Sequence, residues 1–253
     1  MKLAVAGGTG IVGRHVVHAA RDRGHDVVVV SRSEGIDRRS GAGLAPALDG
    51  VDVVVDATNA TTMRRPEGAA LFTEMTRHLH SAGVERGVSG LVTLSIVGLE
   101  RVPLGYYQAK LAQEGAAKAG PLPATIVRAT QFHEFPAQVL ARARTGPVAF
   151  VPHMRIQPVA ARALAEVLVD VAEQPAGGDT VEVAGPQVAD LVALARATVR
   201  RRGRHLAVLP LRVPGAAGKA MRTGGQLPGL GARIVGPTFD EWLRTDDSTH
   251  PAF

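Results

Sequence analysis

The sequence contains no cysteine, few aromatic residues and no long apolar run. Without cysteine the chain forms no disulfide bonds and no thiolate nucleophile. Aromatic residues make up 4% of the chain, which leaves few rings for stacking on nucleic-acid bases. No apolar stretch approaches the length that spans a bilayer, and the first residues lack the features of a signal peptide. We therefore expect a cytoplasmic protein with no membrane partner.

The formal net charge of +6 comes almost entirely from arginine residues spread along the chain. Four of them cluster in residues 200–204, at the expected end of a helix, where cations suit the helix dipole. Scattered charge of this kind does not indicate a nucleic-acid surface, so we expect no nucleic-acid partner.

Short strands rich in valine alternate with helices through the first half of the chain. This alternation predicts an α/β fold with a doubly wound, Rossmann-like parallel sheet. After residue 130 the alternation of strands and helices becomes less regular. Residues 210–237 are rich in glycine and proline and are expected to form a loop with a short helix. The expected strands are 2–6, 26–31, 51–55, 91–95, 124–128, 179–184 and 205–209. The expected helices are 11–23, 67–82, 105–119, 133–145, 159–173 and 188–201.

A glycine turn, Gly7-Gly8-Thr9-Gly10-Ile11-Val12-Gly13, lies between the first strand and the first helix. Glycines in this position let the backbone approach a pyrophosphate, and the helix N-terminus attracts its charge. The spacing fits both the general dinucleotide pattern and that of short-chain dehydrogenases, and the turn alone does not choose between them. It predicts nucleotide binding.

The end of the second strand favours NADP over NAD as the cofactor. An NAD site usually has an acidic residue there, whereas this strand ends Ser31-Arg32-Ser33. An arginine and two hydroxyls suit a ribose 2′-phosphate. Glu34 is the one nearby residue that opposes this assignment.

Tyr106 and Lys110 lie four residues apart, on one face of an expected helix. A nearby ammonium is expected to lower the pKa of the phenol and make it a proton donor or acceptor. Ser95 ends the preceding strand and could orient a carbonyl oxygen, with Thr93 as the reserve candidate. Tyr107 is the rival tyrosine and is interpreted as packing or pocket lining.

The histidines do not predict a metal site. His78 and His80 are two residues apart on an expected helix and therefore point to different faces. His133 and His153 could meet in the pocket, although each alone is typical of a hydrogen-bonded structural histidine.

Taken together, these motifs resemble the short-chain dehydrogenase/reductase superfamily, and most of all its atypical, NmrA-like branch of NAD(P)H-binding proteins. The resemblance covers roughly residues 1–160. It is carried by the glycine turn, residues 31–33, 56–59 and 95–98, Tyr106 to Lys110, and residues 128–132. The Tyr–Lys pair is often missing in this branch, and its presence here favours an enzyme.

The resemblance implies a role for each of these segments. The turn, with Gly7, Thr9, Gly10, Ile11, Val12 and Gly13, would bind the pyrophosphate. Ser31, Arg32 and Ser33 would hold the adenosine phosphate, and Ala57, Thr58 and Asn59 would line the adenine and ribose. Tyr106, Lys110 and Ser95 would be catalytic, with Lys110 also on the nicotinamide ribose. Thr130 would flank the nicotinamide, and Gln131, Phe132 and His133 the substrate.

We interpret the chain as an NADPH-dependent oxidoreductase that reduces a small, fairly apolar carbonyl, quinone or enone. Residues 1–150 would bind NADP, and residues 151–253 would form a smaller substrate-binding lobe that does not fold alone. The chain would act as a monomer or homodimer. Two alternatives are a non-catalytic NAD(P)-sensing regulatory protein and a nucleotide-sugar epimerase or dehydratase with tightly held NAD.

Overall fold

The computed structural model describes residues 1–59, 65–174 and 177–248. The described residues form two compact units, each assembled from several segments. Unit 1 takes those within 1–96, 104–128 and 162–181, and unit 2 takes those within 97–103, 129–161 and 182–253. The units interleave along the chain. The predicted functional division at residue 150 stays a prediction.

A parallel sheet of seven strands runs in the order β12-β9-β5-β4-β3-β1-β2. This is the predicted Rossmann-like α/β fold. The strands are β1 (Lys2–Ala6), β2 (Asp26–Val30), β3 (Val53–Asp56), β4 (Gly90–Ile96), β5 (Ala124–Ala129), β9 (Thr180–Ala184) and β12 (Arg233–Ile234).

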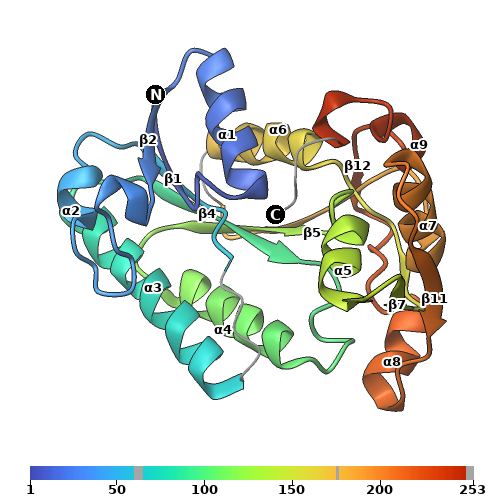
Figure 1. Ribbon diagram of the computed structural model, residues 1–253. Helices are drawn as coiled ribbons and strands as arrows, with labels where there is room; N and C mark the ends of the chain where they lie inside the picture. The colour runs from blue at the N-terminus through green and yellow to red at the C-terminus, as the bar shows by residue number, and fades with distance from the viewer. Residues whose placement is uncertain (60–64, 175–176, 249–253) are drawn as a thin grey trace. The chain divides into compact units, whose positions relative to one another are not determined.

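In unit 1, helices cover the sheet on both faces (Figure 1). Helices α1 (Ile11–Asp22) and α6 (Ala161–Ala172) lie on one face, and α3 (Arg65–Glu85) and α4 (Gly105–Ala119) on the other. Strand β3 is buried along its whole length, as its apolar sequence requires between two helical layers. Two short elements, η1 (Arg32–Glu34) and α2 (Leu44–Ala47), follow β2.

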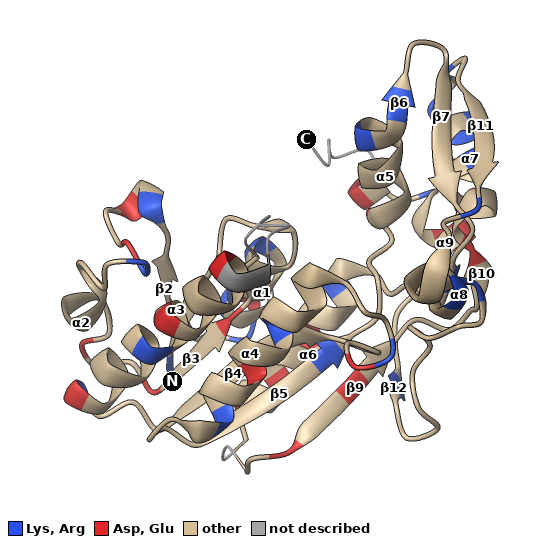
Figure 2. Ribbon diagram, turned by 90° about the horizontal axis from the view of Figure 1, so that it is seen from below, with Lys and Arg blue, Asp and Glu red and all other residues tan. Residues whose placement is uncertain are grey.

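Unit 2 contains a three-stranded sheet of β6 (Arg144–Thr145), β7 (Val148–Pro152) and β11 (Ala207–Leu211). Helices α5 (Phe135–Ala143) and α7 (Leu191–Arg201) contact β7 (Figure 2). The remaining elements are β8 (Arg155–Ile156), β10 (Ala189–Asp190), α8 (Gly215–Arg222), α9 (Phe239–Trp242) and η2 (Asp246–Ser248).

The predicted elements differ from the structure mainly after residue 130. Helix α4 has its predicted bounds, and α8 is the short helix expected within 210–237. The helix predicted over 188–201 begins at Leu191, because the Asp190 side chain accepts a hydrogen bond from the Val192 N–H and caps it. The helix predicted over 133–145 spans only Phe135–Ala143 and is followed by β6. The other strands and α-helices that were not predicted are β7, β8, β10, β12, α2 and α9.

Candidate active site

The glycine turn has the geometry of an anion-binding site. Gly7 has a φ of +77°, and its carbonyl accepts a hydrogen bond of 2.9 Å from the Gly10 N–H. A Cβ on Gly13 would lie 2.0 Å from the Gly7 oxygen, so no larger residue fits there. Helix α1 begins after Gly10 with no side-chain cap and no acidic residue in its first turn. Its N-terminal N–H groups therefore remain available to a pyrophosphate.

The other residues of the turn differ in exposure. Thr9 is exposed and Ile11 is half-buried, whereas Val12 is buried in unit 1. Val12 could therefore offer a ligand its main chain only.

The end of β2 presents one cation and two hydroxyls. Ser31 and Ser33 are joined by a hydrogen bond of 2.8 Å between their hydroxyls. Arg32 is exposed, and among the described residues its guanidinium makes no hydrogen bond or ion pair. Glu34 is exposed in the same short helix. This arrangement suits a phosphate near Arg32.

The segment after β3 packs directly on the glycine turn. The Ala57 N–H donates to the Ala6 carbonyl, and a Cβ on Gly7 would lie 3.0 Å from the Ala57 oxygen. Asn59, two residues on, accepts a hydrogen bond of 2.8 Å from the Tyr106 hydroxyl. The structure thus links the predicted cofactor-binding turn to the predicted catalytic tyrosine.

Tyr106 and Lys110 occupy the first turns of α4, but their polar atoms bind different groups. The Lys110 ammonium donates to the Leu94 carbonyl of β4 at 2.8 Å and to the Gln113 side chain. Burial raises the pKa of Tyr106 to about 12. The expectation that Lys110 lowers this pKa is wrong in the structure, because the phenol is partly buried against a neutral amide and the ammonium is bound elsewhere.

Lys110 is part of a buried polar network that the sequence analysis missed. Burial lowers the pKa of Lys110 to about 8, opposed by the carboxylates of Asp56 and Glu114. Asp56 is 1% exposed and accepts hydrogen bonds from Arg38 at 2.8 Å and Gln113 at 2.9 Å. Two features of the sequence could have indicated this network: Asp56 ends an apolar strand, and Gln113 lies three residues after Lys110. Nothing in the sequence indicated Arg38.

Ser95 and Thr93 both remain candidates for the substrate-orienting hydroxyl. They are two residues apart in β4, so both side chains lie on the same face of the strand. Both are buried, and neither hydroxyl has a hydrogen-bond partner among the described residues. Unpaired buried hydroxyls in this position are free to bind a ligand.

The predicted pocket residues after β5 belong to unit 2. The Thr130 hydroxyl donates to the Gln157 carbonyl at 2.6 Å. The Gln131 amide is buried and has no partner among the described residues, and Phe132 is half-buried. This segment therefore retains one unsatisfied polar side chain, as a binding site would.

His133 is enclosed within unit 2. It is 1% exposed, and its Nε2 lies 3.0 Å from the Pro237 carbonyl. Its ring contacts Phe239 and Trp242, with ring centroids 5.4 and 5.3 Å away. Burial lowers its pKa to about 4, so the ring is neutral at pH 7.

The remaining histidines bind separate partners. His78 pairs with the Arg38 carbonyl, His80 with the Ala117 carbonyl and His153 with Asp190. Among the described residues no three His, Asp or Glu side chains form a metal-binding group. No helix in the described part of the chain has the length and hydropathy to span a membrane.

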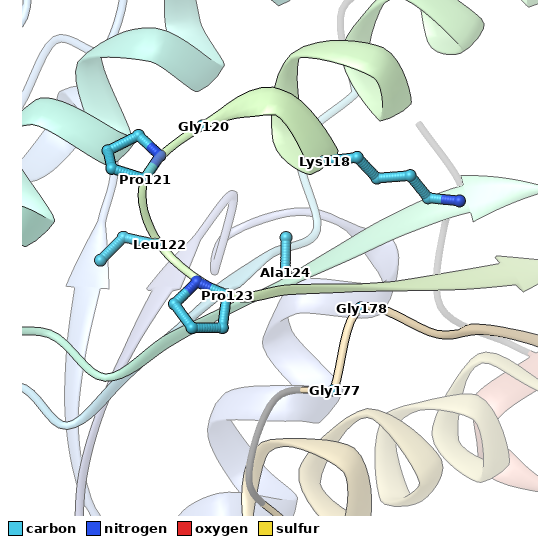
Figure 3. Close-up of a pocket in the computed structure, with 8 residues that line it drawn as sticks. All are labelled: Lys118, Gly120, Pro121, Leu122, Pro123, Ala124, Gly177 and Gly178. Carbon is cyan, nitrogen blue, oxygen red and sulfur yellow. The ribbon is translucent and has the colours of Figure 1, made fainter.

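An open hollow of about 490 Å³ lies at the other end of unit 1 (Figure 3). The segment between the end of α4 and the start of β5 forms most of its lining. The glycine turn and Asn59 follow the carboxyl ends of their strands, where open α/β sheets bind ligands. The hollow is therefore separate from the candidate active site. Its lining residues are Lys118, Gly120, Pro121, Leu122, Pro123, Ala124, Gly177 and Gly178.

Residues 7–175 match the family described as NAD(P)H-binding. The photosystem II assembly factor Ycf39 of Synechocystis sp. is 32% identical over 107 residues, which are 35% of this chain and 32% of that protein. The chain thus matches about a third of this curated relative.

Solved structures share the fold. The structure of MoeE5 in complex with UDP-glucuronic acid and NAD has a TM-score of 0.77 at 15% identity, covering 100% of both chains. An NADPH-dependent quinone oxidoreductase from Escherichia coli has a TM-score of 0.69 at 18% identity, covering 95% of this chain and 98% of its own.

Proposed function

The chain belongs to the NAD(P)H-binding family, and on this premise we propose that it is an NADPH-dependent oxidoreductase. Its substrate is a small, fairly apolar carbonyl, quinone or enone. The observation that carries the proposal is the contact between the Tyr106 hydroxyl and Asn59, beside the glycine turn.

In this proposal the cofactor lies along the carboxyl ends of β1, β2 and β3. The N–H groups at the start of α1 hold the pyrophosphate, and Arg32 with Ser31 and Ser33 holds the 2′-phosphate. Ala57, Thr58 and Asn59 line the adenosine, and Lys110 holds the nicotinamide ribose. When bound, the reduced nicotinamide supplies the hydride.

Tyr106 is the proton donor. With a pKa of about 12 it keeps its proton at neutral pH, and it donates that proton to the substrate oxygen as the adjacent carbon gains the hydride. The resulting phenolate then regains a proton from solvent. Ser95, or Thr93 in reserve, donates a hydrogen bond to the substrate oxygen. Thr130, Gln131, Phe132 and His133, which belong to unit 2, are the further cofactor- and substrate-binding residues that the sequence resemblance implies.

Replacing Tyr106 by phenylalanine tests the proposal. We expect Tyr106→Phe to reduce NADPH oxidation by about 100-fold or more, since a general acid contributes that much, and to leave cofactor affinity nearly unchanged. Absorbance at 340 nm with a panel of quinones and ketones gives the rate, and calorimetry gives the Kd of NADPH. Unchanged turnover contradicts the assignment, and a loss confined to Tyr107→Phe transfers the role to the rival tyrosine.

A cofactor sensor without catalysis is the second candidate. It is favoured by the raised pKa of Tyr106, which makes the phenol a weaker acid. A partner protein whose binding distinguishes NADP⁺ from NADPH, with no turnover of any carbonyl or quinone, would support it. Purified protein that retains NAD⁺ would instead favour the epimerase or dehydratase alternative.

A further inference from the structure

Gln113 joins the Lys110 ammonium to the Asp56 carboxylate inside unit 1. Its Oε1 accepts a hydrogen bond from the Lys110 Nζ, and its Nε2 donates one of 2.9 Å to Asp56 Oδ2. Gln113 and Asp56 are each 1% exposed and Lys110 is 3% exposed. Water therefore does not compete for these hydrogen bonds.

Only an amide satisfies both neighbours of Gln113. The other oxygen of Asp56 already accepts from Arg38, so Oδ2 needs a further donor. The Lys110 ammonium already donates to Leu94 and needs a further acceptor. Leucine offers neither group, and an ionised glutamate offers acceptors only.

Asp56 also holds the segment that binds Tyr106. Its Oδ1 accepts a hydrogen bond of 3.1 Å from the Thr58 N–H, and the next residue, Asn59, accepts the Tyr106 hydroxyl. Asp56 is thus connected to Lys110 through Gln113, and to Tyr106 through the segment from Thr58 to Asn59.

We propose that Gln113 is a positioning residue. Its amide bridges the Asp56 carboxylate and the Lys110 ammonium, stabilises the charged form of Lys110 and holds the ammonium at the carboxyl end of β4. The inference rests on the proposed function only in giving Lys110 a role in the reaction. The charged groups around Lys110 are Asp56 from β3, Arg38 from the loop after η1, and Glu114 on α4. Glu114 is paired with Arg128 of β5.

The test follows the titration of Lys110 directly. The chain has four lysines, so ¹³C,¹⁵N-lysine labelling gives few NMR signals, and Lys110→Met identifies the one of interest. The midpoint of the Lys110 signal is measured between pH 6 and 10 without substrate. Gln108→Leu, on the exposed face of the same helix, is the matched control for Gln113→Leu.

We expect Gln113→Leu to lower the Lys110 midpoint by about one pH unit, because the ammonium loses an acceptor and its link to Asp56. Gln113→Met, which keeps the side-chain volume and serves if the leucine variant fails to fold, should lower the midpoint as well, because it also lacks the acceptor. Gln108→Leu should leave it at the wild-type value. A midpoint that stays at the wild-type value in either Gln113 variant overturns the proposal.

The kinetic readout separates this proposal from the proposed function. If the protein reduces a carbonyl or quinone, the alkaline limb of its kcat profile should move with the Lys110 midpoint in both Gln113 variants, with little change in KM. A midpoint that moves in a protein without turnover leaves Gln113 as a positioning residue and rejects the reductase.

Discussion

Tyr106 and Lys110 illustrate what sequence spacing can predict about single residues. Their separation by four residues placed both on α4, as expected, but their partners Asn59 and Leu94 come from other elements. The pKa values depend on those partners and on burial, so the direction for Tyr106 was predicted wrongly. The glycine turn itself could be predicted because Gly7, Gly10 and Gly13 contact one another, whereas its binding of a pyrophosphate stays a prediction.

Replacing the single residue Arg32 tests the cofactor preference. We expect Arg32→Ala to weaken NADPH binding roughly tenfold, since a charge-assisted contact to the 2′-phosphate is lost, and to leave NADH binding unchanged. Calorimetry with both cofactors gives the two Kd values. Arg39→Ala, another exposed arginine of unit 1, is the control. An equal loss for NADH and NADPH would reject Arg32 as the phosphate ligand.

Elements were predictable where the pattern was regular and the ends were marked. The Gly105–Ala119 helix lies between Pro103 and Gly120, and both bounds were predicted. Strand β6 has two residues and depends on pairing with β7, so it carries no periodic signal of its own. Helix α9 has four residues and is fixed by a capping box between Thr238 and Glu241.

Arg23 connects α1 to α6 through a surface network. Its guanidinium contacts Glu166 at 2.6 Å, Asp170 at 2.8 Å and Glu173 at 3.1 Å. We expect Arg23→Met to reduce the free energy of unfolding by roughly 1 kcal/mol, and by less in high salt, because these groups are partly exposed. Urea denaturation measures the change. A cycle with Asp170→Asn that gives no coupling would show that the contact does not stabilise the fold.

At the scale of the whole molecule, the sequence predicted one parallel sheet with a weaker C-terminal part. It did not predict that each unit takes segments from three parts of the chain. Such a division depends on contacts between distant residues, such as the hydrogen bond from the Ile126 N–H to the Asp179 carbonyl. The local sequence pattern does not indicate which distant residues form those contacts.

The stability of unit 2 should depend on pH through His133. Its folded-state pKa is about 4, below the ordinary 6.5, so the neutral ring stabilises the fold above pH 6.5. This contribution is lost as the pH falls towards 4, and the shift corresponds to about 3 kcal/mol. We expect His133→Asn to remove most of that pH dependence.

Trp242 makes this measurement specific to unit 2. It is the one tryptophan of the chain and contacts the His133 ring, so its fluorescence follows unfolding around that ring. Urea titrations at pH 7 and pH 4.5 give the two free energies for each variant. His205→Gln, at an exposed position, is the control and should keep the wild-type dependence. The same slope in His133→Asn and wild type would assign the effect to other groups.

The interleaved segments also constrain how the protein is made. The last part of unit 1 is residues 162–181, and residues 97–103 and 129–161 of unit 2 precede it in the chain. A ribosome therefore releases the first two segments of unit 2 before unit 1 has its final helix, α6. During synthesis the incomplete sheet of unit 1 must therefore avoid aggregation while these segments of unit 2 are already present. A single truncation of the gene also cannot produce either unit alone.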